Sequence, residues 1–502
     1  MTRGGAGYVP ADDPRRRGHR MTTAEIPADD YPSRWAALTV LLLANFMNLI
    51  DVTIVNVALP SIQQDTGATA TQLEWVAAAY VLAFAVGLLP FGRFGDIFGR
   101  RRLFLWGLSG FTLGSALCGI APDIGTLIAA RALQGIAGAM MVPQVLAILH
   151  VIFRADEKAR VFGMVGTITS LGAVAGPVLG GAIIAVDFWG LDWRPIFLIN
   201  LPLGGIALVA ALRLLPVLPR QEDATPDWLG MALFGVAITL IVLPLIEGRT
   251  FDWPWWTFAA MIAAIPVGAL FLWWEHLRSR SGASALMPAS LLSNGAYLSN
   301  VALVTLFFSG VPGMFLMLAI FFQSGFGLTP LESGLATVPF PVGVMIASTV
   351  MGRLLGHWHD RRIFIGAATL TVGMTLMHLT VLATGDTLGA IRFALPLFVC
   401  GLGMGTAIPA LFETTLSTVA GTDAGAGSGA MQAFQQAGAV LGIAIVSQLF
   451  FPTLGPNETA VATASRETFV EAAALGFWWP ILAFAGLALF TGLRFSLRRM
   501  RG

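Results

Sequence analysis

Residues 35–58 read WAALTVLLLANFMNLIDVTIVNVA, a stretch of 24 residues in which Asp51 is the only charged side chain. A helix of about 20 mostly apolar residues is long enough to cross a bilayer. Similar runs recur along the 502-residue chain, of which 56% is apolar and 11% is charged, against about 25% charged in a soluble protein. The composition therefore predicts a polytopic membrane protein. It excludes a cytosolic enzyme, a disordered protein and a nucleic-acid binder.

The apolar runs predict an all-α membrane protein with fourteen membrane-spanning helices. We expect these spans near residues 35–58, 72–91, 103–121, 126–149, 161–186, 195–215, 228–246, 255–274, 295–322, 332–351, 363–384, 389–417, 428–450 and 472–493. The domains expected from them are a disordered basic tail (1–34), a six-helix bundle (35–215), a linker with two additional spans (216–294), a second six-helix bundle (295–493) and a short tail (494–502).

Positive charges are distributed unevenly between the expected loops. If the N-terminus lies inside, the inside segments carry 24 of the 29 Lys and Arg residues, the outside loops carry three and the spans carry two. Short cytoplasmic loops are enriched in Lys and Arg. A missing span would exchange the sides of every later loop and so mix the inside and outside loops. The observed bias therefore supports an even number of spans with both termini in the cytoplasm.

The chain also contains an internal repeat. Residues 71–74 (TQLE) open the second span and residues 92–94 (GRF) close it, while residues 329–332 (TPLE) and 352–354 (GRL) bound the tenth span in the same way. The offset is 258 to 260 residues. Two homologous six-span halves, with two spans inserted between them, account for it. Parallel repeats about an axis normal to the membrane are typical of rocking transporters.

Several kinds of chemistry have no residues to support them. The single lysine, Lys158, follows Glu157 rather than glycine, so no phosphate-binding G-x-x-x-x-G-K-[ST] loop is present and no ATPase site is expected. Cys118 and Cys400 lie in apolar runs and have no metal-ligand spacing. We treat residues 357–360 (HWHD) as a degenerate loop rather than a metal site. The chain is expected to be no enzyme and to hold no metal or cofactor, with a proton gradient as its energy source.

Four motifs carry a family resemblance. They are DVTIVNVALP at residues 51–60, GRFGDIFGRRR at 92–102, RALQG at 131–135 and GAVAGPVLGG at 172–181. In this order and in these spans they resemble the major facilitator superfamily. The first motif and the two apolar runs between residues 216 and 294 resemble its fourteen-span drug:proton antiporter branch. The resemblance implies two six-helix bundles in a pseudo-twofold arrangement, with two extra central helices.

The resemblance implies proton coupling at acidic and basic groups within the spans. Asp51 lies mid-span, where burial disfavours a charged carboxylate, so it could take a proton when sealed from water and release it when wetted. Arg131 keeps its charge and needs an acceptor, so it could tune this site. Glu413 is a less expected acid that could pair with a cationic drug or carry a second proton. Structural roles for all three, including a solvated position for Glu413, remain alternatives.

Two further groups of residues are expected to act during transport. The substrate cavity is expected to include Asn48, Gln134, Phe307, Phe308, Met314 and Glu413, since amides, thioethers and aromatic faces suit varied ligands. In the related family, the loop after span 2 and the glycine-rich motif of span 5 control the change of conformation. Here these gating positions are Gly92, Asp96, Gly99, Arg100, Arg101, Gly172, Gly176, Pro177, Gly180 and Gly181.

Together these features predict a proton-coupled exporter of amphipathic organic drugs or of one antibiotic, working by alternating access. We expect it in the cytoplasmic membrane of a bacterium as a multi-pass protein, with small molecules, protons and lipid as its partners and a single chain as the functional unit. The alternative is an exporter of the same fold with a narrow metabolite substrate, such as an amino acid, a siderophore or a lipid precursor.

Overall fold

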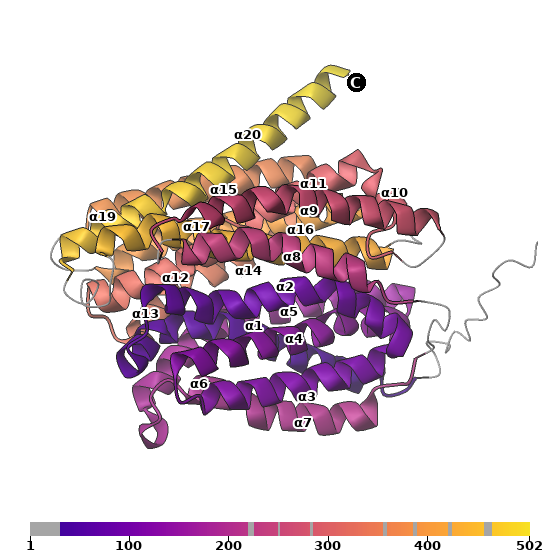
Figure 1. Cartoon of the computed structure of the whole chain (residues 1–502), viewed down its shortest axis with the longest axis horizontal. Coiled ribbons are helices and arrows are strands. Elements are labelled where there is room, and N and C mark those ends of the chain that lie inside the picture. Colours follow the sequence, from indigo (N-terminus) through magenta and orange to yellow (C-terminus); the bar gives the residue numbers. More distant parts are fainter. Residues whose placement is uncertain are drawn as a thin grey trace, which may run out of the picture.

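The computed structural model describes residues 31–218, 225–248, 251–281, 285–354, 359–384, 389–419, 424–455 and 464–501. These ranges form long helices that lie roughly side by side (Figure 1) and contain no strand. The first bundle consists of α1 (Arg34–Thr66), α2 (Ala70–Phe98), α3 (Arg100–Gly119), α4 (Ile124–Ile152), α5 (Ala155–Val186), α6 (Pro195–Leu198) and α7 (Asn200–Leu214).

Two long helices and one short helix connect this bundle to the second: α8 (Trp228–Glu247), α9 (Trp255–Arg280) and α10 (Ala289–Leu292). The second bundle consists of α11 (Gly295–Phe308), α12 (Pro312–Ile320), the π-helix η4 (Phe321–Gly325), α13 (Pro330–Thr337), α14 (Pro339–Leu354), α15 (His359–Leu382), α16 (Ala394–Leu416), α17 (Ala424–Leu454), α19 (Arg466–Gly476) and α20 (Trp478–Arg501). In Figure 1, α13 and α19 lie at the left end of the molecule and α10 at the right end; we call these the α13 end and the α10 end.

Twelve helical stretches in the described residues are long and apolar enough to cross a membrane. The all-helical membrane fold is therefore confirmed, but not the count of fourteen spans. The expected spans 103–121 and 161–186 do coincide with helices, α3 of 20 residues and α5 of 32 residues. Both helices begin with charged residues, and only Ala175–Val186 of α5 registers as a shorter apolar helix.

Several expected single spans are interrupted helices. The span 295–322 bends between α11 and α12 and tightens into the π-helix η4, while 332–351 divides at Val338 between α13 and α14. The spans 195–215 and 472–493 divide in the same way, at α6/α7 and α19/α20. Uniform hydropathy cannot reveal such breaks, because both sides of each break are equally apolar.

Matching N-terminal caps confirm the internal repeat and correct its register. Thr69 caps α2 with Gln72 at the third helical position, and Thr329 caps α13 with Glu332 in the same reciprocal arrangement. These caps lie 260 residues apart, the offset that also relates Gly92 to Gly352. The residue equivalent to Thr329 is therefore Thr69 and not Thr71.

The two bundles meet along helices from both halves of the repeat. Helix α2 packs along α17, and α5 packs against α13 near the α13 end. The inserted helix α8 lies against both α2 and α17. Trp75 on α2 donates to Glu247 on α8 at 2.6 Å, and Gln448 on α17 donates to the Leu245 carbonyl at 2.5 Å. The inserted pair thus covers the seam between the bundles on one side.

Candidate functional site

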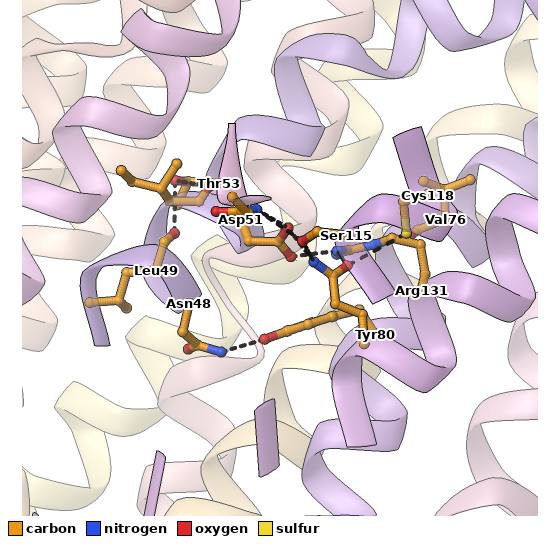
Figure 2. A network of polar contacts seen from close by, with 12 residues as sticks. Asn48, Leu49, Asp51, Thr53, Val76, Tyr80, Ser115, Cys118 and Arg131 are labelled. Carbon is orange, nitrogen blue, oxygen red and sulfur yellow. Dashed lines mark hydrogen bonds and ion pairs between the residues drawn. The ribbon is translucent and has the colours of Figure 1, made fainter. Parts of the chain in front are cut away.

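Asp51 lies in the middle of α1 and is fully buried. Its Oδ2 accepts a hydrogen bond from Nη1 of Arg131 on α4, which is 1% exposed, at 2.5 Å. Figure 2 shows the two side chains reaching toward each other across the first bundle. The carboxylate and the guanidinium therefore form an ion pair sealed from solvent within one bundle.

Three further polar side chains complete a network around this pair. Gln134, one turn after Arg131, donates to Asp51 Oδ1 at 2.7 Å and to the Ser115 hydroxyl at 2.6 Å, and its Oε1 accepts from Arg131 at 2.6 Å. Asn200 at the start of α7 donates to Ser115 at 3.1 Å and to Asp51 Oδ1 at 3.4 Å. Both carboxylate oxygens of Asp51 are thus supplied with donors from α4 and α7.

Aromatic rings enclose the guanidinium. The carbon centre of the Arg131 guanidinium lies 4.3 Å from the centre of the Tyr80 ring and 5.7 Å from that of Phe197, within range of cation–π attraction. Arg131 Nε also donates to the Val76 carbonyl of α2 at 3.2 Å. Asn48, one turn before Asp51 on α1, donates to the Tyr80 hydroxyl. The network joins α1, α2, α3, α4 and α7 at one point.

The arrangement supports a change of partner. A buried ion pair compensates its own desolvation only while both partners remain in place. A proton that neutralised Asp51 would remove its attraction to Arg131. The remaining partners of the guanidinium would be Gln134, the Val76 carbonyl and the rings of Tyr80 and Phe197. The geometry therefore places this ion pair at the junction of five helices.

The expected cavity residues lie in different surroundings. Gln134 belongs to the buried network and Asn48 to its edge, whereas Phe307 and Met314 are fully buried within the second bundle. Phe308 is half-buried and stacks on the Phe412 ring at 6.0 Å. Glu413 is exposed, three residues before the end of α16. The structure brings Asn48 and Gln134 close to Asp51 and leaves the others apart from it.

A small cavity of about 60 Å³ lies between the two bundles. It is lined by residues of α1, α5, α12, α13 and α14: Thr53, Asn56, Val57, Pro177, Phe315, Ala319, Ser333, Thr337 and Phe340. A volume of this size has room for several water molecules, since each needs about 10–15 Å³ of such space. The wall has four residues with hydroxyl or amide side chains: Thr53, Asn56, Ser333 and Thr337. None of them was among the cavity residues expected from the sequence.

The glycine-rich motif of α5 contacts both bundles. Gly172, Gly176 and Gly180 face α1, where an added Cβ would collide with Leu49, Thr53 and Ile54 respectively. The next residue, Gly181, faces the other bundle, where an added Cβ would lie 2.5 Å from the Cα of Leu331 on α13.

The partner helix has a glycine in the same seam. A Cβ on Gly334 of α13 would collide with the carbonyl oxygen of Pro177. Gln323 of η4 adds a hydrogen bond across the seam, donating to the Val57 carbonyl of α1 at 2.9 Å. The two bundles are therefore in backbone contact near the α13 end.

The loop after α2 makes its contacts near the α10 end. Gly99 takes a φ of 97° where α2 ends and α3 begins, a conformation that glycine adopts without strain. Arg100 donates to the Ala147 carbonyl at 3.0 Å, and Arg101 donates to the Leu212 carbonyl at 2.5 Å. A Cβ on Gly92 would meet no atom within 4 Å. The side chain of Asp96 lies outside the described residues.

Three polar members of the network, Ser115, Asn200 and Tyr80, were missing from the sequence interpretation. Ser115 and Asn200 are polar residues inside apolar runs, a signal present in the sequence but weaker than a charge. The described part of the chain holds no group of three or more His, Cys, Asp or Glu side chains that could bind a metal ion. His357 and Trp358 of the HWHD stretch lie outside it.

Comparisons with known proteins agree with this architecture. The family model described as Major Facilitator Superfamily matches residues 41–229 and 224–443. The chain is 39% identical over 473 residues to a probable actinorhodin transporter of Streptomyces coelicolor, covering 93% of this chain and 80% of that protein. It is 34% identical over 410 residues to the multidrug resistance protein Stp of Mycobacterium tuberculosis, covering 81% of this chain and 74% of the relative.

Solved structures resemble the fold at low sequence identity. A crystal structure of a POT family transporter in complex with a thioalcohol-conjugated peptide has a TM-score of 0.66 over 92% of this chain and 96% of that chain, at 13% identity. At this identity the likeness shows the fold alone.

Proposed function

Because the chain belongs to the major facilitator superfamily, we propose that it is a proton-coupled exporter that moves an amphipathic drug or antibiotic across the bacterial cytoplasmic membrane. The observation that carries this proposal is the buried ion pair of Asp51 and Arg131. An intramembrane carboxylate with a specific charged partner is by default a functional group.

The names of the relatives favour a drug or antibiotic as substrate. One relative is named for actinorhodin and another for multidrug resistance, and both cover more than four fifths of this chain. An amino acid, a siderophore or a lipid precursor is a second candidate, favoured only by the acidic Glu413 at the end of α16. We therefore assign the substrate to the class of amphipathic antibiotics. The buried site fits a family of transporters rather than a family of enzymes.

We further propose fourteen spans with both termini in the cytoplasm. The twelve spans together with α3 and α5 give that number. The α10 end is then the cytoplasmic end, which agrees with the excess of Lys and Arg in the loops assigned to it. The close packing of α5 on α13 lies at the opposite, outer end. We infer from this packing a state closed to the outside, and we propose that one chain is the functional unit.

In the proposed cycle, Asp51 exchanges Arg131 for a proton. Burial opposes a charged carboxylate that has lost its partner, so separation of the pair favours protonation of Asp51. The outer seam must open for a proton to arrive from outside, which requires α5 and α13 to part. Glu413, exposed near the cytoplasmic end, is available as a second acid for a cationic substrate or a proton.

Transport in everted membrane vesicles tests the proposal. An acid-inside gradient is predicted to drive uptake of actinorhodin or of an amphipathic cationic dye, and a protonophore is predicted to abolish it. Asp51→Asn is expected to lower this uptake at least tenfold. Asp65→Asn is the matched control because Asp65, also on α1, pairs with Arg194 near the surface. Gradient-independent uptake, or equal uptake by Asp51→Asn, would refute the mechanism.

A further inference from the structure

The inserted helix pair contains a second group of buried charges, far from Asp51 in the sequence. Asp227 caps the N-terminus of α8 and is 3% exposed, and Glu275 lies near the end of α9 and is fully buried. Neither residue takes part in the network around Arg131.

Two carboxylate oxygens face each other here. A Cβ on Gly230 would lie less than 3.0 Å from both Glu275 Oε1 and Asp227 Oδ2, so these oxygens share one small space. Neither oxygen has a hydrogen-bond partner among the described residues. Two buried carboxylate oxygens this close repel each other when both side chains are charged.

The other oxygen of each carboxylate is satisfied. Asp227 Oδ1 accepts from the Gly230 amide and from Trp274 Nε1, both at 2.9 Å. Glu275 Oε2 accepts from the Met287 amide at 2.7 Å. The side chains are therefore held in place, and only the two facing oxygens accept no hydrogen bond.

Two guanidinium groups lie near the two carboxylates, and one of them contacts a carboxylate. Nε of Arg278 lies 3.3 Å from Asp227 Oδ2, and its Nη2 donates to the Pro226 carbonyl at 3.1 Å. On α2, which packs against α8, Arg93 donates to the Ala285 carbonyl at 2.9 Å, two residues before the amide that binds Glu275. Helix α17, which also packs against α8, has no charged residue, and α10 has none. Among the described side chains, Arg278 thus pairs with Asp227, while Arg93 is bound to the Ala285 carbonyl.

We propose that Glu275 and Asp227 form a second proton-binding site, in which one proton is held between Glu275 Oε1 and Asp227 Oδ2. A proton on Oε1 is donated to Asp227 Oδ2 as a hydrogen bond, beside the ion pair of Asp227 with Arg278, and leaves one charged carboxylate opposite that guanidinium. Two close carboxylates commonly bind one proton in this way. The site fixes the linker residues 285–287 against α9, and through Ala285 it adjoins Arg93 in the loop motif of α2.

The experiment uses the full-length protein purified in detergent, without substrate. Infrared spectra and thermal unfolding midpoints are recorded from about pH 5 to about pH 10, a range that extends well above the ordinary titration of a carboxyl group. Wild type is expected to show a protonated-carboxyl band that persists above neutral pH, and a fall in unfolding midpoint where the band disappears. Both should persist in Asp51→Asn.

Two variants identify the site. Glu275→Gln and Asp227→Asn each place an amide donor between the two side chains, so each is expected to abolish the band and the accompanying fall. Glu247→Gln is the matched control, since Glu247 on α8 already accepts from Trp75, and it should behave as wild type. The proposal is wrong if the protonated-carboxyl band survives in a folded Glu275→Gln or Asp227→Asn variant. It is also wrong if the band of the wild type shifts with sodium concentration at constant pH. This result would be independent of drug transport, because no substrate is present.

Discussion

Asp51 and Arg131 come from α1 and α4, 80 residues apart, and their side chains meet at 2.5 Å with 0% and 1% exposure. Both oxygens of the carboxylate have donors, and the guanidinium is enclosed by Tyr80 and Phe197. A pair this deeply buried gains little net stability from its own attraction. Removing only one of the two charged partners, however, leaves the other charge uncompensated.

A double-mutant cycle on this pair is the first prediction. Asp51→Asn and Arg131→Met alone should each destabilise the protein by about 3–5 kcal/mol, because each leaves a buried group without its partner. The combined variant should lose less than the two changes added together. Thermal or chemical unfolding in detergent gives the three values.

The pair Asp65 and Arg194 is the matched control for that cycle. Its side chains are 35% and 24% exposed, and the ion pair is 2.8 Å long. Exposed pairs contribute about 0–1 kcal/mol, so its coupling should be small. Equal coupling in the two cycles would mean that the Asp51 site is no more than an ordinary ion pair.

The second prediction concerns the close contact between α5 and α13. Gly181→Ala places a Cβ 2.5 Å from the Cα of Leu331, so the closed outer seam must loosen. Overpacking of this kind costs about 1–3 kcal/mol, and about 1.4 kcal/mol corresponds to a tenfold change in the population of the open seam. Ser333→Cys, at a cavity residue that is 1% exposed, reports this opening through its rate of labelling by a membrane-impermeant maleimide.

In the Ser333→Cys background, Gly181→Ala should accelerate labelling about tenfold or more. Gly268→Ala is the control, because a Cβ on Gly268 of α9 would meet no atom within 4 Å. The native Cys118 and Cys400 are buried and should react slowly. An unchanged labelling rate in Gly181→Ala would show that this contact does not close the outer end.

The third prediction tests the hydrogen bond from Gln323 to the Val57 carbonyl. Gln323→Leu removes a bond worth about 0.5–1.5 kcal/mol between the bundles. Labelling of Ser333→Cys should therefore rise by roughly twofold to tenfold. Gln448→Leu removes a similar bond, to Leu245 of α8, which does not cross the outer seam. It should leave the labelling rate unchanged.

Much of the architecture could be predicted from the sequence, because it follows from the length of apolar runs and from charge bias. The helices follow the expected spans, and the motif residues Asp51 and Arg131 lie in contact. The breaks near Ser309 and Val338 could not be predicted, because packing between bundles determines them. The count of fourteen spans stays a prediction.

The charged pair and the motif residues Asn48 and Gln134 were predictable, but the other neutral members of the site were not. Ser115, Asn200 and Tyr80 complete the network around Arg131, but an isolated hydroxyl or amide in an apolar run is too common to identify. The facing oxygens of Asp227 and Glu275 depend on the relative position of α8 and α9. Spacing alone cannot give that position, since the two residues are separated by a turn and most of two helices.

The fourth prediction is a pH effect at the outer loops. Burial, together with the carboxylates of Asp65 and then Asp187, raises the pKa of Asp192, although Arg194 opposes this. A raised pKa means that the folded chain favours the protonated form, so its stabilising contribution is present at low pH and lost as pH rises through the pKa of the folded state. Asp192→Asn should remove this loss. Asn also tolerates the φ of 51° at this position.

Asp123 should show the opposite slope. Hydrogen bonds from the Thr126 amide and hydroxyl lower the pKa of this N-terminal cap of α4. Its stabilising contribution is therefore present above the ordinary pKa of an aspartate and lost as pH falls below it. Unfolding midpoints measured against pH for Asp192→Asn and Asp123→Asn should deviate from wild type in opposite directions. Deviations of the same sign would contradict the account of these loops.

Proton release from purified protein on addition of a drug tests the central claim most directly. Actinorhodin or an amphipathic cationic drug is added to wild type, Asp51→Asn, Glu413→Gln and Glu275→Gln in a weakly buffered detergent solution with a pH indicator. The account predicts proton release from wild type and Glu275→Gln and none from Asp51→Asn, while the result for Glu413→Gln shows whether a second acid contributes. Proton release from Asp51→Asn equal to that from wild type would show that the buried aspartate is structural and that coupling lies elsewhere.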